Sequence, residues 1–309
     1  MKTSQQSLLW ILFFAFSAFL LSSCNKNAES FSTEDTETSN NESTQETTTS
    51  ELDDMTTSLL ESSPDAGTFP GGRTQLADDR ISCDGTTITF SNVNIEKTEG
   101  KVTIVFGPDG CTDKKGNTRK GTIIIRWTGG KWYNVGSYVT VTLENYSING
   151  VQISGTRTTS CKAFTASTAT NAASVTITWT LTGSHTATWP DGTTATRKIN
   201  KTRKWEHSAT EDKFIITNGP SAVNAAEGTN RRGKEYKVYI TSPLVYLGSC
   251  AKTSKVFIPV KGEKVITSIS SAGKAKSLTV NYGNGACDNT YTVTSGTMVK
   301  TLTVSNDGM

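Results

Sequence analysis

Histidine is scarce in this chain of 309 residues: His185 and His207 are the whole supply. Neither lies in a recognisable catalytic motif, and the chain has no Gly-x-Ser-x-Gly sequence. No residue is therefore marked as a nucleophile activated by a histidine base. The members of a Ser–His–Asp triad need not be neighbours in sequence, so that class stays open, but we assign no catalytic residue.

Motifs for cofactors and metals are missing as well. Neither Gly-x-x-x-x-Gly-Lys-Ser/Thr nor Gly-x-Gly-x-x-Gly occurs, which argues against a nucleotide-binding loop. A Cys-x-x-Cys pair is absent and only two histidines could assist, which argues against a zinc site. The segment Asp109–Asn117 resembles a calcium loop only loosely, because Lys114 and Lys115 stand where oxygen ligands are needed. We expect no cofactor and no metal.

The apolar run near the N-terminus is short for a permanent membrane span. It covers Leu8–Leu21, 14 residues, after the basic Lys2. A bilayer-crossing helix needs about 20 apolar residues, whereas this length is typical of a signal peptide. The run ends in Leu21-Ser22-Ser23-Cys24, the pattern of a lipobox. We expect residues 1–23 to be removed and Cys24 to carry palmitate and related acyl chains; an ordinary secretory leader with an incidental cysteine is the alternative. Asn25 follows the cysteine, which by resemblance to enteric lipoproteins favours the outer membrane, with the membrane face left open.

Residues 24–72 hold almost no material for a core. After Cys24 this Ser/Thr-rich segment carries eleven acidic residues and one basic residue, Lys26, which gives a net charge of −10. Low hydrophobicity with charge of one sign does not offset chain entropy. The segment is therefore predicted to be a disordered acidic tether between the lipidated cysteine and the rest of the chain.

Residues 73–309 are predicted to form an all-β body, an antiparallel β-sandwich-like fold. Apolar residues alternate with threonine in runs such as Ser174–Thr182, and turn sequences recur, among them Gly107–Gly110, Asn149-Gly150 and Asn284-Gly285. Short alternating strands at this spacing are typical of sandwiches and barrels. No long amphipathic helix is predicted, and the best place for a short one is Glu206–Asp212.

Cysteine spacing indicates an internal repeat. Ser-Cys pairs precede two similar hairpins, and each hairpin ends in a glycine turn and a second cysteine. The repeat units lie near 82–160 and 235–309, with convergence of two unrelated hairpins as the alternative. An exported chain can form disulfides, and although sequence alone leaves 15 two-bridge arrangements open, the repeat favours Cys83–Cys111 with Cys250–Cys287. Cys161 would then be a free thiol.

Charge gives the clearest indication of a partner. Residues 73–309 hold 29 basic against 17 acidic side chains, about +12 beside the −10 tether. Period two places Arg197, Lys201, Arg203 and Trp205 on one strand face and Lys198 and Lys204 on the other. A second cluster contains Arg231 and Arg232. Candidate anion-binding residues are therefore Arg197, Lys201, Arg203, Lys204, Arg231 and Arg232.

Such a surface would attract lipopolysaccharide, acidic glycan or extracellular DNA, without a specific nucleic-acid motif. We expect the acidic tether to compete for the same surface. The plainer interpretation, which we favour, is a solvated basic surface with no dedicated ligand. Four tryptophans could likewise form a sugar-stacking platform, although aromatic residues at strand spacing more often belong to the core; these are Trp127, Trp132, Trp179 and Trp189.

The chain resembles uncharacterised lipoproteins of Bacteroidota. The resemblance rests on the leader with Cys24 and on distinctive segments across most of 83–309. These segments are Gly110–Asp113, Gly116–Gly121, Glu144–Gly150, Gly155–Arg157, Gly228–Arg231, Ser242–Val245, Tyr282–Gly285 and Cys287–Asn289. The resemblance carries no known activity; it implies an envelope location and one β-body in two copies.

Together these observations predict a lipid-anchored cell-envelope protein with a non-catalytic binding or structural role, held to the membrane through Cys24. The alternative is an enzyme that acts on envelope or extracellular polysaccharide. Acids converging with aromatic rings in a deep cleft would favour the enzyme, and a flat or grooved surface would favour binding. Oligomeric state is left open.

Overall fold

The computed structural model describes residues 31–66, 78–91, 93–167, 174–208, 210–221, 223–253, 257–269 and 275–304. They contain a long helix, α2 (Thr33–Ser62), a short one, α3 (Gly248–Thr253), and 14 strands. The strands are β1 (Thr87–Ser91), β2 (Gly100–Thr112), β3 (Thr118–Thr128), β4 (Tyr138–Ile148), β5 (Val151–Ser167), β6 (Ser174–Thr188), β7 (Thr194–Ser208), β8 (Asp212–Asn218), β9 (Ala226–Thr229), β10 (Glu235–Leu247), β11 (Lys261–Ile269), β12 (Ala275–Asn284), β13 (Thr290–Ser295) and β14 (Met298–Thr303). The predicted signal peptide and Cys24 lie outside the described residues.

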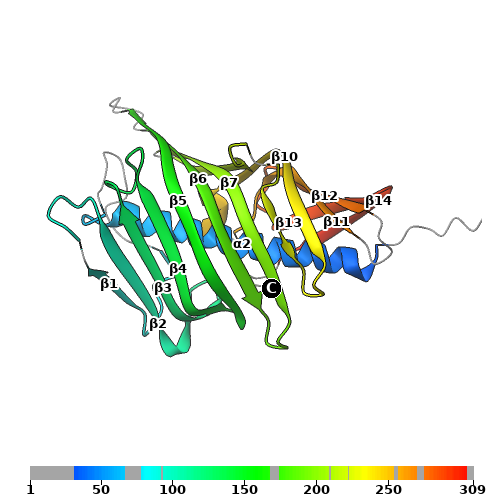
Figure 1. The fold of residues 1–309 in the computed structure, drawn as a ribbon, viewed down its shortest axis with the longest axis horizontal. Helices are drawn as coiled ribbons and strands as arrows, with labels where there is room; N and C mark the ends of the chain where they lie inside the picture. Colours follow the sequence, from blue (N-terminus) through cyan, green and yellow to red (C-terminus); the bar gives the residue numbers. More distant parts are fainter. Residues whose placement is uncertain are drawn as a thin grey trace, which may run out of the picture.

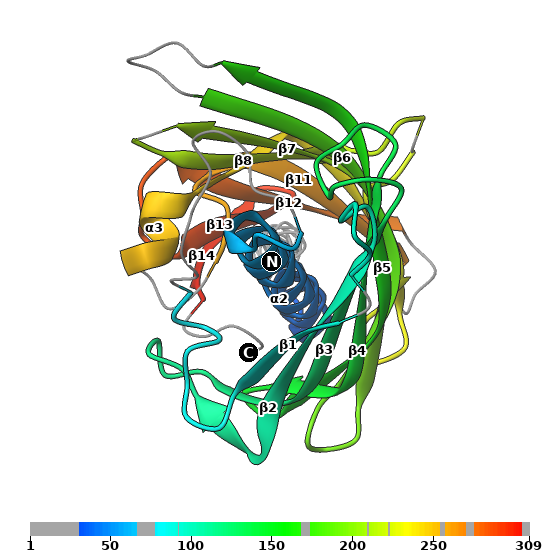
Figure 2. The ribbon, with the colours of Figure 1, turned by 90° about the vertical axis from the view of Figure 1, so that its left-hand side faces the viewer.

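All strands belong to one antiparallel sheet. Neighbours follow chain order from β1 to β8, then β10 to β14, while the short β9 pairs with β7 and β10. The all-β antiparallel class is therefore confirmed. The sheet curves around α2, which lies along its concave side (Figures 1 and 2). The layer that packs on the inner face of the sheet is thus a helix and not a second sheet.

Strand alternation sorts side chains as the sequence predicts. On β6, Val175, Ile177, Trp179 and Leu181 are all buried, while the threonines between them are half-buried. The same holds for the two hairpin strands that suggested the repeat, whose apolar residues are buried; these are Val102, Ile104 and Phe106 on β2 and Leu278, Val280 and Tyr282 on β12. Period two therefore identifies the concave face correctly.

The sequence predicts the turn at Asn149-Gly150 correctly, but its predictions of a turn at Gly107–Gly110 and of a short helix are wrong. Asn149 and Gly150 both have positive φ, 49° and 83°, and join β4 to β5 in a two-residue turn that favours this dipeptide. Gly107–Gly110 is not a connection, because it lies inside β2 where the pairing with β3 shifts register. The predicted helix over Glu206–Asp212 is wrong, because β7 continues to Ser208 and β8 begins at Asp212.

The prediction of a disordered tether over residues 24–72 is wrong for Thr33–Ser62, which form α2. Ser32 caps the helix: its side chain accepts a hydrogen bond from the Asp35 amide at 3.1 Å, and Asp35 accepts one from the Ser32 amide at 2.9 Å. This capping box satisfies two amides that a helix start leaves unpaired. Glu34 and Asp35 in the first turn also suit the positive end of the helix dipole.

Intrinsic propensity does not account for the rest of α2. Serine, threonine and asparagine dominate it, and these residues are poor helix formers. Its large apolar side chains are confined to the C-terminal half, where Leu52, Met55, Leu59 and Leu60 are buried. Even so, 23 of its 30 residues are buried. The helix therefore owes its stability to the sheet that encloses it.

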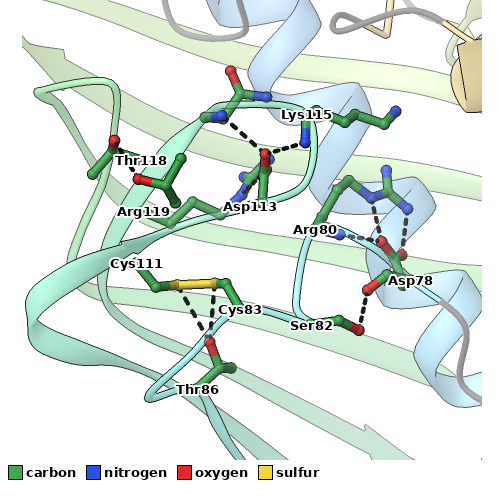
Figure 3. The surroundings of a disulfide bond; sticks show 12 residues. Asp78, Arg80, Ser82, Cys83, Thr86, Cys111, Asp113, Lys115, Thr118 and Arg119 are labelled. Atoms are coloured by element: carbon green, nitrogen blue, oxygen red, sulfur yellow. Dashed lines mark hydrogen bonds and ion pairs between the residues drawn. A yellow bond between two sulfur atoms is a disulfide. The ribbon is translucent and has the colours of Figure 1, made fainter.

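Both predicted disulfides are confirmed, and Cys161 is free and buried. Cys83 precedes the β1–β2 hairpin and bonds to Cys111 near the end of β2 (Figure 3). Cys250 precedes the β11–β12 hairpin and bonds to Cys287 just after β12. The two hairpins are thus cross-linked alike, while a repeat extending over 82–160 and 235–309 stays a prediction.

Candidate functional site: an acidic helix in a basic groove

Three of the six predicted anion-binding residues face inward from β7. Arg197, Lys201 and Arg203 are at most 4% exposed, on the same face as the buried Trp205. Lys204 is on the outer face, as predicted, and pairs with Glu206 at 2.7 Å. The face assignment is confirmed, but this cluster is not an open surface. It lines the concave side of the sheet, and its occupant is α2.

The centre of this site consists of two helix carboxylates and three strand cations, which we call the central cluster: Glu42, Glu46, Arg197, Lys201 and Lys264. Arg197 donates to both oxygens of Glu42, at 2.9 and 3.0 Å, and also contacts Glu46. Lys201 donates to Glu46, and Lys264 donates to Glu42 at 3.1 Å. All five side chains are at most 5% exposed. Water therefore screens these interactions little.

The pKa values in the central cluster show which charges prevail. Burial by itself raises the pKa of Glu42 and of Glu46, but the neighbouring cations outweigh burial and hold both below the ordinary value, Glu46 well below it. Burial, reinforced by repulsion from Arg197, lowers the pKa of Lys201 to about 8. At neutral pH all five groups are ionised, so the cluster is a buried network of opposite charges.

Ion pairs continue along α2 on either side of the central cluster. Toward the C-terminal end, Arg119 donates to Glu51 at 2.5 Å and also contacts Asp113 and Tyr146. Next to the cluster, Arg157 pairs with Asp53 at 2.5 Å and donates to the Thr49 carbonyl.

Two further arginines and one lysine complete the row of contacts. Arg203 donates to Thr57 at 2.9 Å, Arg80 pairs with Asp54 at 2.8 Å, and Lys276 contacts Asp35 near the helix start. We call the inward cations that contact α2 the groove cations: Arg80, Arg119, Arg157, Arg197, Lys201, Arg203, Lys264 and Lys276. They come from β3, β5, β7, β11, β12 and the segment before β1.

The second predicted basic cluster also contacts α2, near its N-terminal end. Arg232 pairs with Glu37, and the amide of Arg231 donates to Asn41 at 2.8 Å. The Arg231 side chain turns away, to Asp191 at 2.5 Å and to the face of the Trp189 ring at 4.6 Å. The structure therefore brings Arg231 and Arg232 to one end of the groove, but they are separate from the central cluster.

Tryptophan side chains mostly form core, not a sugar-binding platform. Trp127, Trp132 and Trp179 are at most 2% exposed, and Trp189 is partly buried under Arg231. Trp132, Trp179, Trp205 and Phe214 follow one another in ring contacts of 6.0–6.4 Å. Arg203 lies 4.0 Å from the centre of the Phe214 ring, so this row supports a groove cation.

The histidines have different environments. His185 is 2% exposed on β6 beside Arg157, Arg197 and Lys201; burial and these cations lower its pKa to about 2, so it is neutral. His207 Nδ1 lies 2.5 Å from Asp212, and its Nε2 lies 4.0 Å from Glu61 at the end of α2. Both are better understood as parts of the wall that surrounds the helix.

The loop that loosely resembles a calcium site is held by its own hydrogen bonds. Asp113 accepts from the amides of Lys115 and Asn117, both at 2.9 Å, and from Arg119 at 3.0 Å (Figure 3). Asp113 thereby orients Arg119 toward Glu51. Among the described residues no group of three or more histidine, cysteine or acidic side chains could hold a metal ion. Within the same part of the chain, no helix is long and apolar enough to cross a membrane.

Sequence reasoning found the cations and missed their partners. The acidic residues of the predicted tether supply the other half of the site, above all Glu42, Glu46, Glu51 and Asp53. The signal was present as the charge balance, −10 beside about +12. Comparison with protein-family models, curated proteins and solved structures finds no match.

Proposed function

We propose that the protein is a lipid-anchored cell-envelope protein with a non-catalytic binding or structural role. One structural observation supports the non-catalytic part: most buried cations of the concave face pair with carboxylates of α2. The groove is thus built to hold an acidic chain segment. The anchor rests on the lipobox at Cys24 and the short apolar run before it. An outer-membrane location is part of this proposal.

The alternative, an enzyme acting on polysaccharide, needs two acids that face an open cleft. Glu42 and Glu46 do converge with the aromatic rings of Tyr236 and Tyr246. They belong to the helix that fills the groove, and Arg197 and Lys201 hold them as carboxylates. This arrangement favours a binding site occupied by a segment of its own chain.

The anchor is tested by Cys24→Ala in the native host. We expect the variant to lose labelled palmitate and to leave the membrane fraction, because one thiol carries the lipid. Cys161→Ala is the matched control, since it removes a buried thiol and should leave labelling and fractionation unchanged. A Cys24→Ala protein that is still labelled and still membrane-bound would exclude the lipobox interpretation.

Anionic polymer is the expected external partner of the proposed binding role. Most groove cations are buried and pair with carboxylates of α2, so low-salt binding of lipopolysaccharide or acidic glycan should depend on outward lysines such as Lys198 and Lys204. Affinity should fall steeply with salt because bound counterions are released. Affinity measured for wild type and for Lys198→Ala with Lys204→Ala at several salt concentrations decides this. Undiminished affinity in the double variant would exclude the outer face of β7 as the binding surface.

A further inference from the structure

We propose that the groove is a recognition site for an acidic helix, and that the α2 of a second copy of this chain can occupy it in place of the chain's own. The ligand class is thus an acidic, serine- and threonine-rich peptide that becomes helical when bound. The proposal concerns what fills the groove, and it holds whether or not Cys24 carries lipid.

The contacts of α2 are those of a ligand in a site. The helix shares no strand pairing with the sheet, and side chains make most of its polar contacts. Carboxylates along α2 meet cations from five strands: Asp35 meets β12, Glu42 meets β7 and β11, Glu46 meets β7, Glu51 meets β3 and Asp53 meets β5. Charge complementarity along a whole helix fixes both its direction and its register in the groove.

The groove also recognises that its occupant is a peptide. Arg157 donates to the carbonyl of Thr49, and Arg203 to the carbonyl of Asp53. At the other end, the side chain of Asn230 donates to Thr38 at 2.9 Å, and the amide of Arg231 donates to Asn41. Buried pockets for Leu52, Met55 and Leu59 add apolar contacts in the second half. An acidic polysaccharide would satisfy the cations but not these contacts, so the observations favour a helix.

Exchange between copies requires that the connection between α2 and the sheet can reach a second groove. Residues 64–66 stay beside the sheet, because Lys97 donates to the Pro64 carbonyl at 3.0 Å and Ala66 is fully buried, so the connection from α2 to Asp78 consists of residues 67–77. Eleven residues can span up to about 40 Å when extended, which approaches the ~45 Å length of a 30-residue helix. Every chain carries one donor helix and one acceptor groove. Two copies can therefore exchange helices reciprocally and form a closed two-fold dimer.

Zero-length cross-linking of the full chain tests the proposal directly. Wild-type chains with ordinary and ¹⁵N nitrogen are mixed, unfolded and refolded together at high concentration, and a carbodiimide then joins paired carboxylates to lysines. The informative products are Glu46–Lys201 and Glu42–Lys264, which join α2 to the groove. In the dimer fraction we expect about half of these products to contain one light and one heavy peptide. The internal control is Glu206–Lys213, a 3.0 Å pair between β7 and β8, which should never mix isotopes.

A charge exchange gives an independent readout. Asp53→Arg and Arg157→Asp each place like charges together in one chain, so neither should yield a stable monomer. Mixed during refolding, the two variants should form a heterodimer of twice the monomer mass, because both helix–groove interfaces are then matched. A matched control exchanges the exposed pair Lys198 and Glu227, 3.9 Å apart within the sheet; those variants should stay monomeric.

Three results would overturn the proposal. The first is that the Glu46–Lys201 and Glu42–Lys264 products contain two peptides of the same isotope in every fraction, the dimer fraction included. The second is absence of a heterodimer when the Asp53→Arg/Arg157→Asp double variant folds as a monomer. The third is that dextran sulfate abolishes these cross-links while a second copy never contributes to them, which would assign the groove to anionic polymer. The first result decides the matter even if the exchanged variants fail to fold.

Discussion

Arg197→Met should be one of the most destabilising single substitutions in the chain. Arg197 is fully buried and pairs with Glu42 and Glu46. Methionine fills similar space but removes the cation that the two buried carboxylates share, and each of them keeps only one lysine partner. Removing one partner of a buried ion pair costs about 3–5 kcal/mol. For a chain of this size each kcal/mol lowers the melting temperature by roughly 2–4 °C. The expected decrease is therefore roughly 6–20 °C.

Lys198→Met is the matched control, one position along the same strand. Its ammonium is 73% exposed and 3.9 Å from Glu227, and an exposed pair of this kind contributes at most about 1 kcal/mol. Urea and thermal unfolding followed by circular dichroism at pH 7 measure both variants. The difference in unfolding free energy between Arg197→Met and wild type should also narrow as pH falls toward 4, because Glu42 and Glu46, each left with one lysine partner, then take up protons more readily. Equal stability of the two variants would refute the role of Arg197 in holding α2.

Three further predictions follow from the structure. Acid should destabilise the protein: the pKa values of Glu42 and Glu46 are lowered on folding, so their contribution is complete above the unfolded value near 4.5 and is lost as pH falls through the folded values. Glu46→Gln should reduce the loss of unfolding free energy between pH 7 and pH 3, measured by urea unfolding. Asp53→Asn should not reduce it, because burial raises the pKa of Asp53 and its ionisation therefore does not favour the folded state. If Glu46→Gln loses as much stability in acid as wild type does, the central cluster is not the origin of the acid sensitivity. Replacing the cysteines of either bridge by serine should cost about 3.5–4 kcal/mol, from loops closed over separations of 28 and 37 residues, and an unfolding free energy within 1 kcal/mol of wild type would contradict this. Cys161 should resist iodoacetamide at pH 8 until urea is added, because it is buried and burial raises its pKa to about 11; rapid alkylation without urea would contradict its burial.

Strand pattern and cysteine spacing made much of this architecture predictable. Alternation on β6 and β7 identified the inward faces, including the buried row that contains Arg197 and Trp205. The similar hairpins identified both disulfides among 15 arrangements. These features are local: a strand shows its two faces within a few residues, and a hairpin sets the positions of its own cysteines. The sheet order of β1 to β8 follows the same logic, because neighbours in sequence pair in space.

Helix α2 could not be predicted from its own residues. Its threonines and serines have low helix propensity, and its acidic residues repel one another, which together predict disorder. Both arguments assume that the segment stands alone. In the groove, Arg197, Lys201 and Lys264 remove the repulsion at Glu42 and Glu46, and enclosure by the sheet supplies the packing that propensity lacks. The missing information was tertiary, because these three partners of Glu42 and Glu46 lie at least 151 residues further along the chain.

The contacts between α2 and the groove depend on ion pairs more than on apolar packing, and this affects both the stability and the specificity of the helix in the groove. Buried ion pairs contribute little net stability compared with apolar residues of similar size, because desolvation offsets their attraction. Arg157 and Asp53 illustrate this, since burial lowers the pKa of the arginine and raises that of the aspartate despite their 2.5 Å contact. If both the groove and the helix were apolar, the helix would bind more tightly, but it could slide or reverse. Carboxylates opposite cations on β3, β5, β7 and β11 accept only one register, and a segment with so little helix propensity unfolds when it leaves. The groove therefore holds α2 in one register, which is what the proposed exchange between copies requires.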